Sequence, residues 1–407
     1  MKAIVYDFSI TKYMAAKTFG KRYPKLYYGK RSALSLREWP DPKEPGPHEI
    51  RMRPLLAGIC GTDMGAILYK SSPSLTPFNS FPAVLGHEVV GMVDACGAKV
   101  KGIEPGQRIS VDPFISCAVR GIDPPCPACA QGLHAMCHYS GTKRGLSEGM
   151  LMGFCRDLPG AFSEQCTIHE SMAIPVPREI PDRLAVMIEP LSVGVHAVLR
   201  KVPEDGESVL VIGGGMIAYS VITALRMANK NIHITHLSLL PYQRDMAMTL
   251  GATQAFTTKE ELLNDMEGRI GAKKHRPAMG RTVYLGGYAK VYDCIGSEQS
   301  LADALHYTRE RGAIIVVGTA GHMSDLDWTF VWAKELSIIG SVGYGRETWE
   351  GETVSTHAIT LQMLMQQENA QLVKLVTHEY SLDHYEQAII ANIERAKYQS
   401  IKTVFTI

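Results

Sequence analysis

Two hydrophobic patterns divide the chain near residue 190. Before that point, short apolar runs stand between turns rich in glycine and proline, as at Ile50–Arg53, Val89–Val93 and Arg108–Val111. Short strands separated by regular turn signals are typical of a barrel-like β unit. The pattern therefore predicts a barrel-like β unit in the first part of the chain.

After residue 190, strand-length apolar runs alternate with helix-length segments. Strands are expected at Ser208–Ile212, Ile232–Thr235, Val291–Cys294 and Ala313–Val317, and a helix that ends at Ala228 is expected between the first two. Alternation of this kind is typical of α/β proteins with a doubly wound parallel sheet. The chain is therefore expected to combine a β unit with an α/β unit.

A glycine-rich turn joins the first of these strands to the following helix. It reads Val211-Ile212-Gly213-Gly214-Gly215-Met216-Ile217-Ala218. In a dinucleotide-binding turn, Gly213 would make the tight turn, Gly215 would let the backbone approach a pyrophosphate, and Ala218 would let the helix pack closely on the sheet. The phosphates would face the free N–H groups of the helix N-terminus, so the candidate cofactor-binding residues are Gly213, Gly214, Gly215, Met216 and Ile217.

The acid that usually follows such a turn by about 20 residues is absent. Its position falls on Ser238, in the run Thr235-His236-Leu237-Ser238. A carboxylate there would hold the ribose 2′-hydroxyl of NAD and repel the 2′-phosphate of NADP. With His236, Ser238 and Arg244 nearby, its absence slightly favours NADP, although NAD could still bind through other contacts.

Candidate metal ligands lie in three separate fragments. They are Cys60 in Gly58-Ile59-Cys60-Gly61-Thr62-Asp63, His87 and Glu88 in Gly86-His87-Glu88-Val89-Val90-Gly91, and Glu189 in Ile188-Glu189-Pro190-Leu191. A thiolate, an imidazole and a carboxylate form the mixed set that a catalytic zinc binds, with one position left for water or substrate. A lone cysteine or histidine is usually a packed or surface side chain, but the three fragments together favour a zinc site.

These fragments resemble the zinc-containing medium-chain alcohol dehydrogenase superfamily. The signature is Gly86-His87-Glu88-x-x-Gly91-x5-Gly97-x-x-Val100, and the pairing of Cys60-Gly61-Thr62-Asp63 with Glu189-Pro190-Leu191-Ser192 is most similar to the sorbitol and threonine dehydrogenase branches. The resemblance implies a GroES-like β-barrel catalytic domain at residues 1–190 and 346–407. It also implies a Rossmann dinucleotide-binding domain at residues 191–345.

The resemblance further implies roles for individual residues. Cys60 and His87 would bind the catalytic zinc together with a water and either Glu88 or Glu189, and the sequence leaves that choice open. Thr62 resembles the hydroxyl residue that takes the proton of the alcohol, whose pKa the zinc lowers. Relatives often carry a histidine a few residues after the cysteine ligand, whereas this chain reads Asp63-Met64-Gly65-Ala66. The proton would therefore leave by another route, such as water or a ribose hydroxyl.

Four further cysteines suggest a second, structural zinc. Cys126, Cys129 and Cys137 match three members of the four-cysteine lobe of the superfamily, while Cys117 lies nine residues before Cys126, with residues 118–125 inserted between them. Four thiolates would form a closed tetrahedral site with no room for substrate. The membership of Cys117 is the weaker part of this prediction, and a reduced loop without metal is the alternative.

Two insertions extend beyond the family pattern. Residues 8–37 hold Lys12, Lys17, Lys21, Arg22, Lys25, Lys30, Arg31 and Arg37 and no acid. A solvated flap or subunit contact is the plainer interpretation of this insertion, and a lid for an anionic substrate is the other. Residues 259–281 are expected to contain a short helix at Glu260–Met266, followed by a basic loop.

Composition limits the partners. The chain has 407 residues, with 42 basic and 41 acidic side chains, so its total charge indicates neither a nucleic acid nor a membrane as partner. The first residues do not resemble a signal peptide, and nine cysteines in so long a chain are expected to be thiols or metal ligands. We expect a cytoplasmic homodimer or homotetramer that binds a small alcohol or carbonyl compound.

The sequence thus predicts a zinc-dependent oxidoreductase that transfers a hydride between NAD(P) and a secondary alcohol of a polyol, sugar or amino alcohol. A catalytically impaired sensor that binds zinc and a nucleotide is the alternative, because the relay histidine and the ribose-binding acid are both missing.

Overall fold

In the computed structural model, the chain forms two compact units. The first contains residues 1–189 and 373–407, and the second contains residues 190–372. The structure describes the backbone of residues 1–407 and all side chains except those of residues 367–369. Within the described residues, no helix is long and apolar enough to span a membrane.

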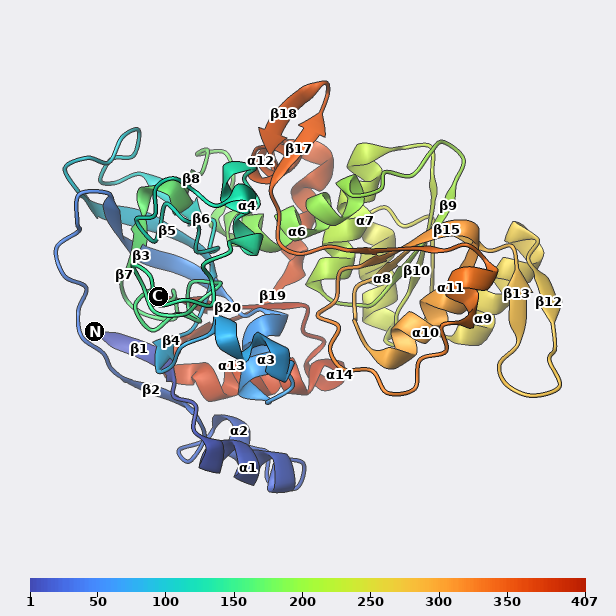
Figure 1. Ribbon diagram of the computed structural model, residues 1–407, viewed down its shortest axis with the longest axis horizontal. Helices are drawn as coiled ribbons and strands as arrows, with labels where there is room; N and C mark the ends of the chain where they lie inside the picture. Colours follow the sequence, from blue (N-terminus) through green and yellow to red (C-terminus); the bar gives the residue numbers. More distant parts are fainter. The chain divides into compact units, whose positions relative to one another are not determined.

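The first unit is built mainly of β-strands (Figure 1). A seven-stranded sheet has the order β19-β20-β3-β5-β6-β8, with β7 paired to β3, and a smaller sheet has the order β2-β1-β4. The strands are β1 (Lys2–Tyr6), β2 (Leu34–Glu38), β3 (Glu49–Gly58), β4 (Ala83–Val84), β5 (Glu88–Cys96), β6 (Arg108–Val111), β7 (Cys166–His169), β8 (Ala173–Pro175), β19 (Val376–Ser381) and β20 (Lys402–Thr406). The helices are α1 (Ile10–Phe19), α2 (Lys25–Tyr28), α3 (Gly61–Ile67), α4 (Pro127–Ala130), α5 (Asp182–Ala185), α13 (Tyr385–Ile393) and α14 (Arg395–Tyr398).

Antiparallel pairing explains why this unit alternates apolar and polar residues. Along β3, the residues Ile50 and Met52 are buried in the main core of the unit, whereas Arg51 between them is only half-buried. Side chains of a strand point alternately to the two faces of a sheet, so one face can pack on the core while the other meets solvent. The β unit predicted for the first part of the chain is confirmed.

The second unit contains a six-stranded parallel sheet of the order β11-β10-β9-β14-β15-β16. The sheet strands are β9 (Ser208–Ile212), β10 (His233–Leu237), β11 (Gln254–Phe256), β14 (Tyr288–Asp293), β15 (Thr308–Val316) and β16 (Ser337–Gly340), and two hairpins are formed by β12 (Lys273–His275) with β13 (Val283–Leu285) and by β17 (Arg346–Trp349) with β18 (Glu352–Ser355). The helices are α6 (Ile188–Leu199), α7 (Met216–Ala228), α8 (Pro241–Thr249), α9 (Lys259–Asp265), α10 (Glu298–Tyr307), α11 (Thr329–Ala333) and α12 (Thr356–Leu364). The strand order reverses at β9, and a ligand of a doubly wound sheet binds at such a switch point.

The second compact unit extends beyond the domain boundary that the family resemblance implies. We expected the return at residue 346, whereas the second unit extends through Leu372. The β17–β18 hairpin and α12 belong to the second unit because buried polar contacts hold them to α6. His196 Nδ1 lies 2.5 Å from Glu347 Oε1, and the hydroxyls of Ser192 and Thr360 are 2.9 Å apart.

Candidate functional site

Cys60 lies at the junction between β3 and α3, where the local backbone fixes its direction. It is the N-cap residue of α3, and its Sγ accepts a hydrogen bond from the Thr62 amide at 3.4 Å. The Asp63 carboxylate accepts a hydrogen bond from the Cys60 amide at 2.9 Å, which completes a capping box. The thiol is therefore held by a short, well-defined turn, with the Thr62 hydroxyl 3.6 Å from the sulfur.

His87 comes from a different strand region and meets the same turn. It is buried just before β5, and its Nδ1 lies 3.5 Å from Asp63 Oδ1. Neither atom has a hydrogen-bond partner within normal distance among the described residues. With Nδ1 facing Asp63, the other ring nitrogen is left for a different partner, and a carboxylate behind an imidazole is the arrangement that orients histidine ligands of metals.

The electrostatics of this pair favour a metal site. Burial raises the pKa of the Cys60 thiol, but the charge of His87 and a hydrogen bond with it outweigh that effect and bring the pKa down to about 7. Burial alone would lower the pKa of His87, whereas Asp63 and Cys60 hold it well above its usual value. The thiolate and the imidazolium thus stabilise one another, and a metal ion that binds such a pair displaces the proton.

The Glu88 carboxylate is engaged by a buried cation. Lys402, from the last strand, donates a hydrogen bond to Glu88 Oε2 and another to the Ile59 carbonyl at 3.0 Å. Both charged side chains are only 2% exposed. Burial lowers the pKa of Lys402 to about 8. The sequence analysis missed Lys402, because nothing near it in the chain marks it as a partner of Glu88.

Glu189 lies at the start of α6 and is buried. Burial raises its pKa to about 8, against the opposing effect of His87. The carboxylate is thus close enough to the Cys60–His87 pair for their charges to act on it. Among the described residues, however, the possible ligand atoms of Cys60, His87 and Glu189 do not all lie within 4.8 Å of one another. The donor set nevertheless has the chemistry of a catalytic zinc site, namely a thiol, an imidazole and an acid.

The four cysteines of the predicted lobe lie together. The ligand atoms of Cys117, Cys126, Cys129 and Cys137 all lie within 4.8 Å of one another. The sulfurs of Cys117 and Cys137 are 3.8 Å apart, which is about the edge of a tetrahedron with Zn–S bonds of about 2.3 Å. Backbone amides also point at the sulfurs, as from Cys126 to Cys117 at 3.3 Å. The inserted residues 118–125 therefore do not displace Cys117 from the cluster.

The glycine turn has the geometry that a dinucleotide requires. Gly213 has φ of +128°, a conformation that side chains disfavour, and Gly215 is the N-cap of α7 with no side chain over the helix end. Met216 and Ile217 follow as the first residues of α7, and Ala218 is buried on the sheet. A Cβ on Gly214 would lie 2.2 Å from Gln243 Oε1, so Gln243 packs against the turn. The free N–H groups of α7 suit a pyrophosphate.

Of the residues expected at the ribose, His236 and Ser238 lie at the end of β10, and Arg244 lies in α8. Ser238 is buried, and its hydroxyl has no hydrogen-bond partner among the described residues. His236 is buried against the turn, with Nε2 2.6 Å from the Gly213 carbonyl, and burial lowers its pKa to about 4. Arg244 donates two hydrogen bonds to the neighbouring Asp245. The neutral histidine and the paired arginine leave little positive charge for a 2′-phosphate.

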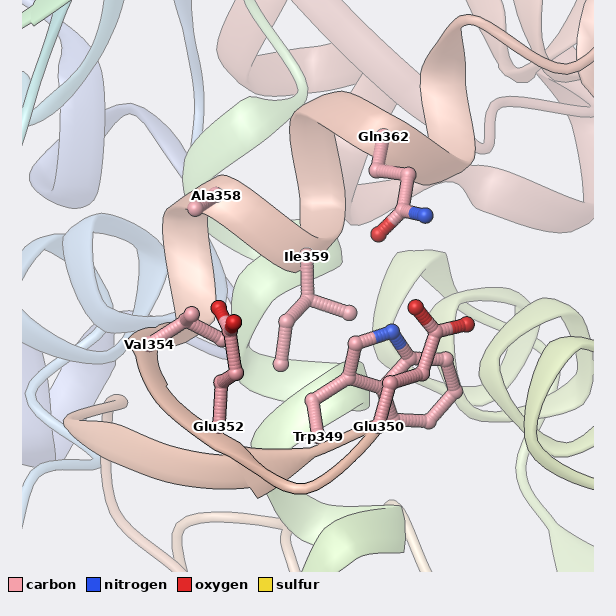
Figure 2. A pocket seen from close by; sticks show the side chains of 7 residues that line it. All are labelled: Trp349, Glu350, Glu352, Val354, Ala358, Ile359 and Gln362. Atoms are coloured by element: carbon pink, nitrogen blue, oxygen red, sulfur yellow. The ribbon is translucent and has the colours of Figure 1, made fainter.

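A pocket of about 300 Å³ lies between the β17–β18 hairpin and α12 (Figure 2). Trp349, Glu350 and Glu352 line it from the hairpin, and Ile359 and Gln362 line it from the helix. Two carboxylates beside an indole favour a cation and repel phosphates. This pocket is therefore not suited to the pyrophosphate of a cofactor.

Comparisons with known proteins point in one direction. Residues 46–178 match the alcohol dehydrogenase GroES-like domain, and residues 217–356 match the zinc-binding dehydrogenase domain. The L-threonine 3-dehydrogenase of Deinococcus deserti is 28% identical over 85% of this chain and 89% of its own length. Galactitol-1-phosphate dehydrogenase from Escherichia coli has a similar fold, with a TM-score of 0.72, 21% identity and full coverage of both chains. The 2R,3R-butanediol dehydrogenase from Bacillus subtilis has a TM-score of 0.72 and 20% identity over 100% of this chain and 99% of its own.

Proposed function

The chain belongs to the zinc-containing medium-chain alcohol dehydrogenase superfamily and is accordingly a zinc-dependent, NAD(P)-linked oxidoreductase. We propose that it transfers a hydride between the nicotinamide and a secondary alcohol held beside Cys60 and His87. The observation that carries the proposal is the pairing of the half-buried Cys60 thiol with the buried His87 imidazole, with Asp63 behind the histidine. No finding favours the catalytically impaired sensor.

The metal ligands of this proposal are Cys60, His87 and Glu189, with a water as the fourth. Glu88 is the less suitable acid, because its carboxylate accepts a hydrogen bond from Lys402. Glu189 is buried and lies within electrostatic range of the pair. Zinc bound there would act as a Lewis acid that lowers the pKa of the alcohol.

The side chains around the pair then have separate tasks. Asp63 orients His87, and the Thr62 hydroxyl, 3.6 Å from the Cys60 sulfur, is placed to receive the proton of the alcohol. The glycine turn of the second unit binds the cofactor pyrophosphate. Because no histidine follows Cys60 in α3, water or a ribose hydroxyl carries the proton onward.

The substrate class is a secondary alcohol of a polyol, sugar or amino alcohol. L-Threonine is the first compound to test, because the relatives that are 26–29% identical carry the name L-threonine 3-dehydrogenase. Purified protein should be assayed with L-threonine, 2,3-butanediol, sorbitol and phosphorylated hexitols, each with NAD⁺ and NADP⁺. Absence of cofactor reduction with every secondary alcohol, in protein that contains zinc, would refute the proposed activity.

Substitutions separate the roles of the residues. Cys60→Ser and His87→Ala should abolish turnover and leave cofactor binding nearly intact, because the glycine turn belongs to the other unit. Thr62→Ala should lower turnover about 10²–10⁴-fold, the usual contribution of a general acid or base. Glu189→Gln should lose the catalytic zinc, whereas Glu88→Gln should keep it. The reverse result would assign the ligand role to Glu88.

The assembly and location belong to the same proposal. We infer a homodimer or homotetramer in the cytoplasm. Strand β16 stands at the end of the strand order of the parallel sheet, and an edge strand is able to pair with a second copy. Light scattering would give the number of chains.

A further inference from the structure

The N-terminal insertion concentrates charge of one sign. Residues 8–37, the basic segment, contain eight lysines and arginines and no acid. All 41 acidic residues and only 34 of the 42 basic residues therefore lie elsewhere in the chain. The near-neutral total hides this asymmetry, and a charge asymmetry between parts of a chain points to an anionic partner of the basic part.

The same segment also exposes apolar side chains. Of the 19 large hydrophobic side chains that are exposed among the described residues, five fall within residues 8–23. They are Phe8 (42% exposed), Ile10 (73%), Met14 (56%), Phe19 (56%) and Tyr23 (56%). Single exposed apolar residues are ordinary, but five so close together mark a contact surface.

One face of α1 fixes the helix to the first unit. Ala16 is buried in the main core of the unit, and the Tyr13 ring packs edge-on against Tyr69 with centroids 5.4 Å apart. A Cβ on Gly20 would lie 2.4 Å from the Tyr27 ring, so the chain after α1 is packed closely as well. In Figure 1, α1 and α2 lie at the edge of the first unit, outside its strands. The helix is therefore a fixed platform rather than a free tail.

An exposed side of α1, next to the packed one, carries apolar and basic side chains together. Ile10, Met14 and Lys17 follow one another at spacings of four and three residues, which place them on one side of α1, and Lys21 lies in the turn just after the helix. Ile10, Met14, Lys17 and Lys21 are all exposed. A membrane interface can accommodate lysines beside exposed apolar residues, because the stems of the lysines cover apolar surface while their charges stay in water.

The charges of the basic segment are not neutralised within the protein. Among the side chains that the structure describes, the ion pair of Arg37 with Asp7, at 3.8 Å, is the single one that involves this segment. A nucleic acid would satisfy the charges but would leave Ile10 and Met14 against water or phosphate. A small phosphorylated substrate would likewise leave the apolar side chains uncovered. An anionic bilayer satisfies both, with phosphates for the cations and acyl chains for the apolar side chains.

We propose that the outward face of α1, with the other cations of the basic segment, docks the protein on an anionic lipid surface. The contact is peripheral and reversible, since a short helix with two apolar positions buries little area. It revises the expectation that a near-neutral chain has no membrane partner. It does not depend on the identity of the alcohol that the enzyme oxidises.

The test is co-flotation of the full-length, zinc-loaded protein with vesicles. We expect binding to vesicles of equal parts phosphatidylcholine and phosphatidylglycerol, and not to phosphatidylcholine alone. Raising the salt from about 0.1 M to about 1 M shortens the Debye length from about 10 Å to about 3 Å and should release the protein. Equal binding to both kinds of vesicle, or to neither, would overturn the proposal.

Matched variants test whether vesicle binding depends on this particular surface or only on the total charge and hydrophobicity of the protein. Lys17→Glu/Lys21→Glu should lower the partition coefficient about thirtyfold or more, whereas Lys99→Glu/Lys101→Glu, the same charge change at exposed lysines elsewhere in the first unit, should have little effect. Ile10→Gln/Met14→Gln should weaken binding, whereas Met279→Gln, at a side chain 89% exposed, should not. Dehydrogenase activity in solution should stay unchanged in all four.

Two other outcomes would assign the surface differently and refute lipid docking. If the α1 variants change the number of chains in the assembly and vesicles have no effect, the surface is a subunit contact. If Lys17→Glu/Lys21→Glu binds vesicles like wild type but raises KM for a phosphorylated alcohol, the segment is a substrate lid.

Discussion

The Glu88–Lys402 ion pair illustrates how a single buried residue can decide stability. Removal of one partner from a buried ion pair leaves an uncompensated charge and usually costs about 3–5 kcal/mol. Both side chains are 2% exposed, and a Cβ on Gly58 would lie 2.3 Å from Glu88 Oε2, so the pair fills its space closely. We expect Lys402→Met to lower the free energy of unfolding by about 3–5 kcal/mol, measured by urea denaturation. The double variant Glu88→Met/Lys402→Met should lose much less, and an equal loss in both variants would mean that packing, not charge, explains the effect.

At the scale of single residues, we expect the end of β10 to influence the cofactor preference. Ser238 supplies no carboxylate to hold ribose hydroxyls, while neutral His236 and paired Arg244 supply no free cation for a 2′-phosphate. We therefore expect NADH and NADPH to bind with similar affinity. Ser238→Asp should shift the preference towards NADH by about 1–3 kcal/mol, the scale of one charge-assisted hydrogen bond.

Titration of the reduced cofactors by their fluorescence would measure this shift without turnover. Ser238→Asn is the matched control, because it adds a similar side chain without charge. If Ser238→Asp and Ser238→Asn behave alike, Ser238 does not face the ribose, and His236→Asp is the next variant to test.

Short motifs allowed the candidate zinc ligands to be predicted from the sequence, whereas their long-range partners could not be predicted. Cys60 and His87 stand in short fragments whose spacing is informative by itself, whereas Lys402 is 314 residues from Glu88 and has no motif of its own. Asp63 was named only as part of the fragment of Cys60, and its approach to His87 depends on the pairing of β3 with β5. Residue roles that arise from tertiary contacts therefore required the structure.

At the scale of elements, the periodicity and length of the apolar runs were sufficient to predict strands and helices. They were not sufficient to predict the boundary between the two units. The strands at Ser208–Ile212 and Arg108–Val111 begin and end where the apolar runs predicted, because a buried strand is a short apolar run between turns. The family resemblance implied a return to the first domain at residue 346, whereas the compact unit that contains the β17–β18 hairpin and α12 extends through residue 372. In sequence, these elements resemble any other surface segment. Only the buried contacts of Glu347 and Thr360 with α6 show where they belong.

The cysteine lobe is an element whose stability should depend on metal. We expect Cys117→Ser to remove one zinc per chain and to make the lobe sensitive to proteolysis, because a closed tetrahedral site needs all four thiolates. Elemental analysis and limited digestion measure the two effects. Cys96→Ser is the control, since Cys96 is a half-buried thiol outside the cluster. A Cys117→Ser variant with unchanged zinc content would show that Cys117 is close to the site without being a ligand.

For the whole molecule, the two proposed metal sites lead us to expect two zinc ions per chain. Removal of one ion should affect activity, and removal of the other should affect folding. The proposed site at Cys60 and His87 would keep a position open for substrate, so a chelator should reach its zinc first and abolish activity. Cofactor binding should persist at that stage, because the glycine turn lies in the other unit. The four-cysteine site is closed and mostly buried, so its zinc should leave only when the lobe unfolds, with a change in circular dichroism. Release of both ions in one phase would mean that the sites are coupled, and a stoichiometry of one would remove one of the two proposed sites.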